Sequence, residues 1–308
     1  MNWAKRIFLF IVINLLVMLT ITLTMTIISR AGLLPHLMYG GMDYASLLVM
    51  CACFGFAGAI ISLLTSRIAA KWAYGIELID MQRPQGAAEE LLAATVRDLC
   101  NRVGITTMPQ VGIYPSREVN AFATGPSRNR ALVAVSSGLL ETMDRQGLEG
   151  VLGHEISHVV NGDMVTMTLL QGIVNTFVMF LAYAGAFAIE NALRGRNSER
   201  RGGGLGYFGR YMLINVLETV LMLFAAPLLY TFSRWREYRA DRGSANLYGA
   251  PTMIHALESL MGYRNAVDKQ HPAFAAFKIN GGGQGLLARL FASHPPLEKR
   301  IEALKRLG

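Results

Sequence analysis

The chain carries the stretch GHEISHVVNGD at residues 153–163, and this stretch decides how the fold is interpreted. Apolar residues recur at helical spacing around it, which predicts a helix over Arg145–Val160. On that helix His154 and His158 are four residues apart and lie about 40° apart on one face, so both imidazoles can bind one metal ion. Glu155 projects beside the pair, where it can take a proton from a water molecule bound to the metal.

A catalytic zinc site needs a third protein ligand and an open position for water. The candidates are the histidines and carboxylates that follow the motif: His255, His271, His294, Glu237 and Asp241. Residues 233–241 are predicted to be helical, which places Glu237 and Asp241 on one face at i and i+4. This fits a glutamate ligand next to an aspartate that orients a histidine. A solvated, charged helix end explains the same spacing, so spacing alone leaves the choice open.

The composition indicates a membrane protein. Of the 308 residues, 52% are hydrophobic and 16% are charged, whereas a soluble protein has about 25% charged residues. Four apolar runs are long enough to be helices: Ile7–Ile28, Tyr44–Thr65, Met164–Ile189 and Tyr211–Phe232. The first two have 22 residues each, which corresponds to about 33 Å of helix and crosses a hydrocarbon core of about 30 Å.

The basic residues predict the orientation of these runs. Lys5, Arg6, Arg67 and Lys71 flank the first two runs at the ends expected in the cytoplasm. A loop rich in arginine and glycine at residues 190–210 does not follow this tendency if it lies outside. One zinc ion with ligands on both sides of residues 164–232 nevertheless requires both flanks to share a compartment. The last two runs must therefore leave and return together, as a full or a partial hairpin.

These considerations predict four segments. Residues 1–66 form an N-terminal transmembrane hairpin, residues 67–163 a cytoplasmic catalytic part, residues 164–232 a second apolar hairpin, and residues 233–308 a C-terminal catalytic part. The zinc ion is expected near the cytoplasmic surface, at about 10 Å from the apolar boundary.

The cytoplasmic part has the pattern of a small α+β domain. A helix is predicted over Gly86–Val103, and strands are predicted over Pro109–Tyr114, Asn120–Thr124 and Arg130–Val135. A last helix is predicted over Leu297–Leu307, where two prolines favour a helix start.

Four separated stretches together resemble the motifs of the HtpX-type membrane metalloproteases, which are relatives of the C-a-a-X prenyl proteases. These are residues 153–163, EYRAD at 237–241, NAFAT at 120–124 and SHPPLEKRI at 293–301. The resemblance implies a mainly α membrane protein with a cytoplasmic, gluzincin-like α+β protease domain. It also implies a zinc endopeptidase of the bacterial inner membrane that takes part in the stress response and in quality control of misfolded or damaged membrane proteins.

The resemblance implies roles for individual residues of the catalytic centre. His154, His158 and Glu237 would hold one zinc ion per chain, and Glu155 would be the general base. His294 would donate a hydrogen bond to the developing oxyanion.

Further residues would support the centre and bind the substrate. Asp241 and Arg300 would form a pair behind the ligands. An edge strand would pair with an extended substrate; its residues are Asn120, Ala121, Phe122 and Ala123.

Other function classes are less consistent with the sequence. An intramembrane protease would bury the motif in a span, but Asp144, Arg145 and Glu149 closely precede it. A transporter or membrane scaffold would use Glu218 inside the fourth run, but it would leave the metal motif unexplained. The net charge of +8 is accounted for by membrane topology. The expected partners are therefore protein substrates and the lipid bilayer, and not nucleic acid.

Overall fold

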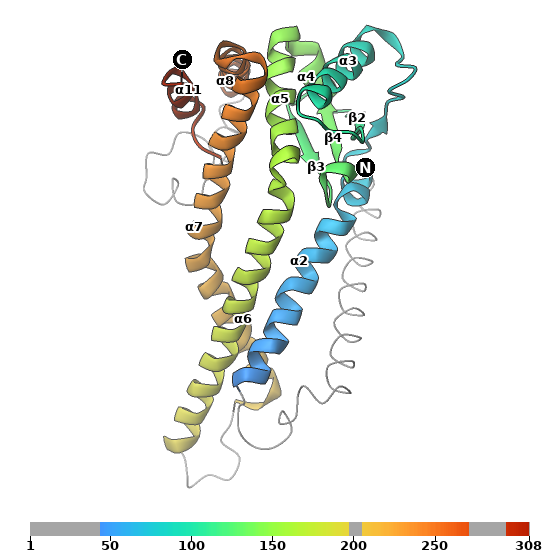
Figure 1. The fold of residues 1–308 in the computed structure, drawn as a ribbon. Helices are drawn as coiled ribbons and strands as arrows, with labels where there is room; N and C mark the ends of the chain where they lie inside the picture. Colours follow the sequence, from blue (N-terminus) through green and yellow to red (C-terminus); the bar gives the residue numbers. More distant parts are fainter. Residues whose placement is uncertain (1–43, 197–204, 271–293, 308) are drawn as a thin grey trace. The chain divides into compact units, whose positions relative to one another are not determined.

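The structure is a computed structural model that describes residues 44–196, 205–270 and 294–307 (Figure 1). The described residues divide into two compact units. An α/β unit contains residues 63–167 and 230–307, and an apolar unit contains residues 44–62 and 168–229. The first predicted span, Ile7–Ile28, lies outside the described residues.

A four-stranded sheet forms part of the α/β unit. Its order is β1 (Glu77–Leu78), β2 (Gln110–Tyr114), β4 (Leu132–Ser136) and β3 (Ala121–Thr124). β2 and β4 are parallel, while β1 and β3 run antiparallel to their neighbours. All five residues of β4 are buried, as expected for a central strand. β3 lies at an edge of the sheet, so one side of its backbone remains free of strand pairing.

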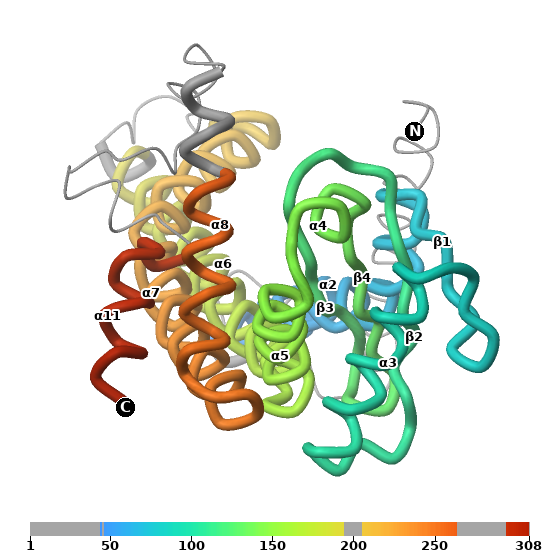
Figure 2. Tube along the Cα trace, turned by 90° about the horizontal axis from the view of Figure 1, so that it is seen from above, coloured from blue at the N-terminus to red at the C-terminus, as the bar shows by residue number. Residues whose placement is uncertain are grey.

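Within the residues that the structure describes, five helices and a short 3-10 turn lie wholly in the α/β unit. They are α3 (Gly86–Arg102), η1 (Arg128–Arg130), α4 (Ser137–Thr142), α5 (Arg145–Asn161), α8 (Ala250–Gln270) and α11 (Leu297–Lys305). Figure 2 shows α5 between the sheet on one side and α8 on the other. One apolar core joins the sheet to α3, α4, α5 and α8 through Leu99 of α3, Val133 of β4, and Leu152 and Ile156 of α5, all fully buried. α5 is therefore the central helix of the unit.

The two ends of α5 have defined caps. The Asp144 side chain accepts a hydrogen bond from the Gly147 N–H and caps the first turn. The helix ends at Gly162, which has φ 67° and ψ 30°, and whose N–H donates to the carbonyls of His158 and Val159. Glycine adopts this left-handed conformation without the steric cost of a Cβ. The next helix begins at once with Asp163, which places that carboxylate directly after the motif.

Three long helices contribute to both units. They are α2 (Tyr44–Tyr74), α6 (Asp163–Arg196) and α7 (Gly206–Tyr248). Each is long and apolar enough to cross a membrane, over residues Ser46–Tyr74, Asp163–Leu193 and Gly206–Tyr248. These three candidate spans correspond to the second, third and fourth apolar runs.

Small side chains bring these helices close together inside the apolar unit. A Cβ added at Gly55 of α2 would lie 2.6 Å from the Thr176 hydroxyl of α6, so only glycine fits there. α6 and α7 share buried apolar contacts, among them Val178 with Leu229 and Ala182 with Ile214.

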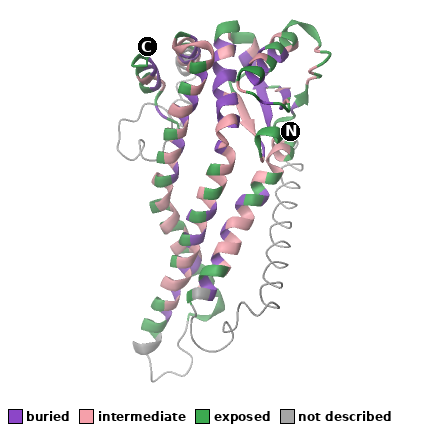
Figure 3. Cartoon of the chain, viewed as in Figure 1, coloured by how far each residue is buried: buried purple, intermediate pink, exposed green. Residues whose placement is uncertain are grey.

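Among the described residues, most of the apolar windows of these three helices are not buried. Only 11% of the apolar window of α7 is buried, and Phe177, Leu223 and Phe224 are strongly exposed. Figure 3 shows exposed and partly buried residues along these helices, in contrast to the largely buried α5. Exposed apolar surface of this extent is unfavourable in water and is satisfied by a lipid environment.

Candidate metal centre

Three buried side chains converge in the α/β unit: His154 and His158 from α5, and Glu237 from α7. The two Nε2 atoms are 3.1 Å apart. His154 Nε2 is 3.5 Å from Glu237 Oε2, and His158 Nε2 is 3.4 Å from Glu237 Oε1. Tetrahedral zinc with ligands at 2.0–2.2 Å places the ligand atoms about 3.3–3.6 Å apart. The three side chains therefore fit a single zinc ion.

The charges of these three residues are strongly coupled. Burial by itself lowers the pKa of His154, but interactions with Asp241 and Glu237 raise it to about 9. Burial raises the pKa of Glu237, but hydrogen bonds with His154, His158 and His294 bring it well below its usual range. Since a metal binds neutral imidazole, it must displace protons from this site, whereas the carboxylate is already charged.

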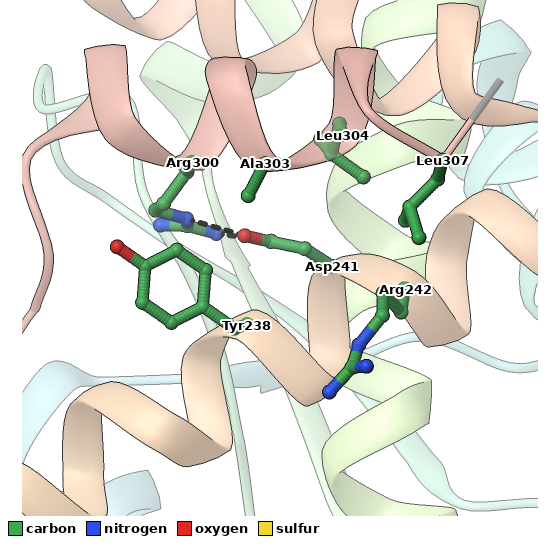
Figure 4. Close-up of a pocket in the computed structure, with 7 residues that line it drawn as sticks. All are labelled: Tyr238, Asp241, Arg242, Arg300, Ala303, Leu304 and Leu307. Atoms are coloured by element: carbon green, nitrogen blue, oxygen red, sulfur yellow. Dashed lines mark hydrogen bonds and ion pairs between the residues drawn. The ribbon is translucent and has the colours of Figure 1, made fainter.

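His154 is supported by a buried ion pair. Its Nδ1 lies 2.9 Å from Asp241 Oδ1. Arg300 of α11 donates to both oxygens of Asp241, over 2.8 Å from Nε and 2.6 Å from Nη2 (Figure 4). Arg300 Nη2 also lies 3.3 Å from His154 Nδ1. A guanidinium can only donate, so we assign the Nδ1 proton to the carboxylate contact, which leaves the Nε2 lone pair for a metal.

The same ion pair borders a cavity of about 180 Å³ between α7 and α11 (Figure 4). Its walls are mainly apolar, with Ala303, Leu304 and Leu307 opposite Tyr238. Burial raises the pKa of Asp241, but the hydrogen bonds from Arg300 and His154 lower it below its ordinary value. Asp241 therefore stays anionic at the back of the site.

His158 has a support of the same kind that the sequence analysis missed. Its Nδ1 lies 2.6 Å from Asp163 Oδ2, and Arg239 Nη2 donates to Asp163 Oδ1 over 2.6 Å. Burial lowers the pKa of His158, but hydrogen bonds to Asp163 and Glu237 raise it above its ordinary value. Asp163 and Arg239 both lie inside the motif stretches at 153–163 and 237–241. The signal in the sequence that could have indicated this support is the carboxylate of Asp163, directly after the glycine that ends α5.

Glu155 lies beside the three ligand candidates and is not one of them. Its Oε2 accepts a hydrogen bond of 2.9 Å from the Ala123 N–H of β3. That N–H points away from β4, toward the free edge of the sheet. The contact holds the Glu155 carboxylate between the ligand group and the edge strand.

A cavity of about 150 Å³ opens onto this group. One wall contains polar groups of the predicted site: Asn120, His154, Glu155, Glu237, His294 and Arg300. The remaining lining is apolar: Val119, Ala121, Leu139, Val151, Met253, Leu257 and Leu260. Phe122 is not among the lining residues, because its ring packs against Tyr74 and Tyr114 at centroid distances of 5.1 Å and 5.8 Å.

The other described histidine candidates are not part of this ligand group. His255 Nε2 contacts both oxygens of Asp144, at 2.9 Å and 3.0 Å. His294 lies next to the group, with Nδ1 2.8 Å from Glu237 Oε2, but its side chain is 60% exposed. His271 is outside the described residues. Among the described candidates, Glu237 is the residue that the structure groups with His154 and His158.

We expect the Asp241–Arg300 ion pair to contribute to the zinc affinity. Asp241→Ala and Arg300→Ala should each weaken zinc binding by about 10–100-fold, because each releases the His154 ring. The double variant should bind zinc no more weakly than the single variant that has the lower affinity, because both changes break the same interaction. Chelator competition on purified protein measures this. Arg306→Ala is the control, because Arg306 is an exposed arginine on the same C-terminal segment. Additive losses of zinc affinity in the double variant would contradict the pairing of Asp241 with Arg300.

The chain is similar to known proteases in sequence and in structure. Residues 87–307 match peptidase family M48, a family of zinc-dependent peptidases. A protease HtpX homolog of Methylacidiphilum infernorum is 48% identical over 307 residues, covering 98% of this chain and 99% of that protein. Protease HtpX of Tolumonas auensis is 46% identical over 305 residues, with the same coverage.

A crystal structure of Ste24p from S. mikatae has a similar fold, with a TM-score of 0.61 at 18% identity. The match covers 93% of this chain and 65% of that one, so this chain spans less than two thirds of that protein. At this identity the likeness supports the fold alone. The predicted resemblance to HtpX-type proteases is confirmed by the curated relatives. The chain therefore belongs to peptidase family M48 and is a membrane metalloprotease.

Proposed function

We propose that the chain is a zinc-dependent endopeptidase in which His154, His158 and Glu237 hold one zinc ion. The observation that carries this proposal is the spacing of 3.1–3.5 Å among the three ligand atoms, with Glu155 adjacent to them. When bound, zinc would polarise the carbonyl of the scissile peptide bond.

Glu155 acts as the general base in this proposal. It accepts a proton from the attacking water and returns it to the leaving amine. Because one of its oxygens is held by the Ala123 N–H, the carboxylate is oriented before the substrate arrives. Such preorganisation keeps the proton acceptor at a fixed distance from the reacting atoms.

The substrate binds as an extended strand along residues 120–123, which comprise Asn120 and the edge strand β3. Because the Ala123 N–H donates to Glu155, pairing relies on the other backbone groups of this edge. Backbone pairing of this kind gives affinity without demanding a particular sequence. Asn120 and Ala121 line the cavity, whereas Phe122 turns its ring to the other face. The apolar wall suits an apolar side chain next to the scissile bond, since an apolar cavity of about 150 Å³ accommodates a benzene ring in another protein.

His294 is proposed to stabilise the oxyanion. Its Nδ1 contacts Glu237, so its Nε2 is the atom available to a substrate in the cavity. Donation from both nitrogens requires the doubly protonated ring. His294→Ala should lower kcat by about 100-fold or more, as the loss of an oxyanion donor does, with zinc content and membrane insertion unchanged. A variant with the wild-type kcat would contradict this role.

We further propose that the four apolar runs form two membrane hairpins, the second of them full or partial, with the active site on the cytoplasmic side of a bacterial inner membrane. The two hairpins are residues 1–66 and 164–232, and the catalytic parts are residues 67–163 and 233–308, as the sequence predicts. The basic flanks and the exposed apolar faces of α2, α6 and α7 support this arrangement. Damaged or misfolded membrane proteins are the proposed substrates.

The function is tested with purified protein in detergent. Zinc-free protein, prepared with a chelator, should not cleave casein, and activity should return when one equivalent of zinc is added. A transporter or scaffold that uses Glu218 would cleave casein in neither state. Cleavage that persists in protein shown to be metal-free would overturn the zinc mechanism.

A further inference from the structure

We propose that Asp163 and Arg239 form a clamp that positions His158 and sets the affinity of the metal centre. This inference rests on the proposed zinc site. The clamp links three places in the α/β unit: the end of α5, the first residue of α6 and the turn of α7 that carries Glu237.

Both oxygens of Asp163 are used. Oδ2 lies 2.6 Å from His158 Nδ1, and Oδ1 accepts from Arg239 Nη2 over 2.6 Å. Asp163 is 1% exposed. A buried carboxylate is costly unless its oxygens have partners, so the two contacts explain how the charge is tolerated at this position.

The contact with Nδ1 decides which nitrogen of His158 can bind a metal. A carboxylate oxygen accepts hydrogen bonds, so the proton of the neutral imidazole is held on Nδ1. The lone pair then resides on Nε2, which is the atom that faces His154 Nε2 and Glu237 Oε1. Asp163 therefore selects the tautomer and the ring orientation that a metal requires.

Arg239 ties this arrangement to the third ligand. It lies two residues after Glu237 on α7. Its guanidinium stacks on the Trp235 ring at 5.0 Å and lies 3.4 Å from the Asn161 carbonyl at the end of α5. The arginine is therefore held between α7 and the α5–α6 junction. The clamp fixes His158 relative to Glu237, as the Asp241–Arg300 pair fixes His154.

Gly162 makes this geometry possible. Its left-handed conformation ends α5 and lets α6 start with Asp163 beside the last turn of α5. Every non-glycine residue is strained in this conformation. The sequence Asn161-Gly162-Asp163 therefore serves as a turn that returns a carboxylate to His158.

A purely structural role for Asp163 is the alternative. An acidic residue in the first turn of a helix stabilises it by interaction with the helix dipole. That role would affect the melting temperature of the zinc-free protein, but it would not change the zinc affinity or the electronic structure of a bound metal. These readouts separate the two explanations.

The experiment uses the full chain in detergent with Asp163→Asn, Arg239→Gln and the double variant. Zinc affinity is measured by chelator competition, and the visible spectrum of the cobalt-substituted protein reports the ligand geometry. Asp163→Asn should weaken zinc binding by about 10–100-fold, as the loss of an outer partner does, and should change the cobalt spectrum. Arg239→Gln should have a smaller effect, and the double variant should match Asp163→Asn.

Asp98→Asn is the matched control, because Asp98 pairs with Arg102 and the Tyr248 hydroxyl away from the ligands. It should bind zinc like the wild type. Wild-type affinity and spectrum in Asp163→Asn would overturn the proposal. If Asp163→Asn does not fold, Arg239→Lys takes its place, because lysine keeps the charge but loses the stacked geometry. Wild-type zinc affinity and cobalt spectrum in that variant would likewise overturn the proposal. Absence of zinc from the wild type would instead refute the zinc site itself.

Discussion

Replacing Glu155 by glutamine is expected to reduce casein cleavage by at least about 100-fold while leaving one zinc ion bound per chain. Glutamine keeps the size of the side chain, and its carbonyl oxygen can still accept from the Ala123 N–H. It cannot accept a proton from water, however, and loss of a general base typically costs about 10²–10⁴-fold. The measurements are the initial rate of casein cleavage and the metal content of the purified variant.

Glu149→Gln is the control for this result. Glu149 lies on the same helix, where it pairs with Arg145 near the surface, so its replacement should leave both quantities unchanged. Zinc loss in folded Glu155→Gln would make Glu155 a ligand. Substantial residual cleavage would show that another group is the base.

Glu237→Ala is expected to lose zinc, and with it all activity. The substitution removes one of three protein ligands and leaves two histidines alone at the site. It also removes the charge that balances His154 and His158, which raises the cost of keeping those rings together. Asp241→Ala, one turn further along α7, should retain zinc with an affinity weaker by about 10–100-fold.

Metal analysis of the folded variants distinguishes these two effects. Glu258→Ala, an exposed glutamate on α8, serves as the control and should bind zinc normally. The ligand assignment is wrong if Glu237→Ala binds zinc normally while His294→Ala does not. In that case His294, whose Nδ1 already lies 2.8 Å from Glu237, would be the third ligand.

The elements around the motif could be predicted because their signals are local. The helical spacing of Leu148, Leu152, Ile156 and Val159 predicts α5, and the structure has it at Arg145–Asn161. The predicted strands correspond to β2, β3 and β4 to within two residues at each end. β1 has only two residues, too few to show a period, and it was not predicted. α4, with six residues, and α8 were missed as well.

Contacts between distant residues could not be predicted from spacing. Arg239 and Asp163 are 76 residues apart in the sequence, and only the packing of α7 against α5 brings them together. Spacing alone also left both Glu237 and His255 open as the third ligand. Only the packing of distant segments brings Glu237, and not His255, next to the two histidines. The orientation of Phe122 depends on Tyr74 and Tyr114, which no pattern within the strand reveals.

X-ray absorption at the zinc edge of the purified wild-type protein tests the central claim most directly. The account predicts one zinc per chain with two imidazole nitrogens near 2.0–2.1 Å and oxygen ligands near 2.0–2.2 Å. No sulfur should appear, since Cys51, Cys53 and Cys100 are free cysteines and none belongs to the ligand group. A sulfur ligand near 2.3 Å, a single imidazole, or protein that takes up no zinc would contradict the assignment of His154, His158 and Glu237.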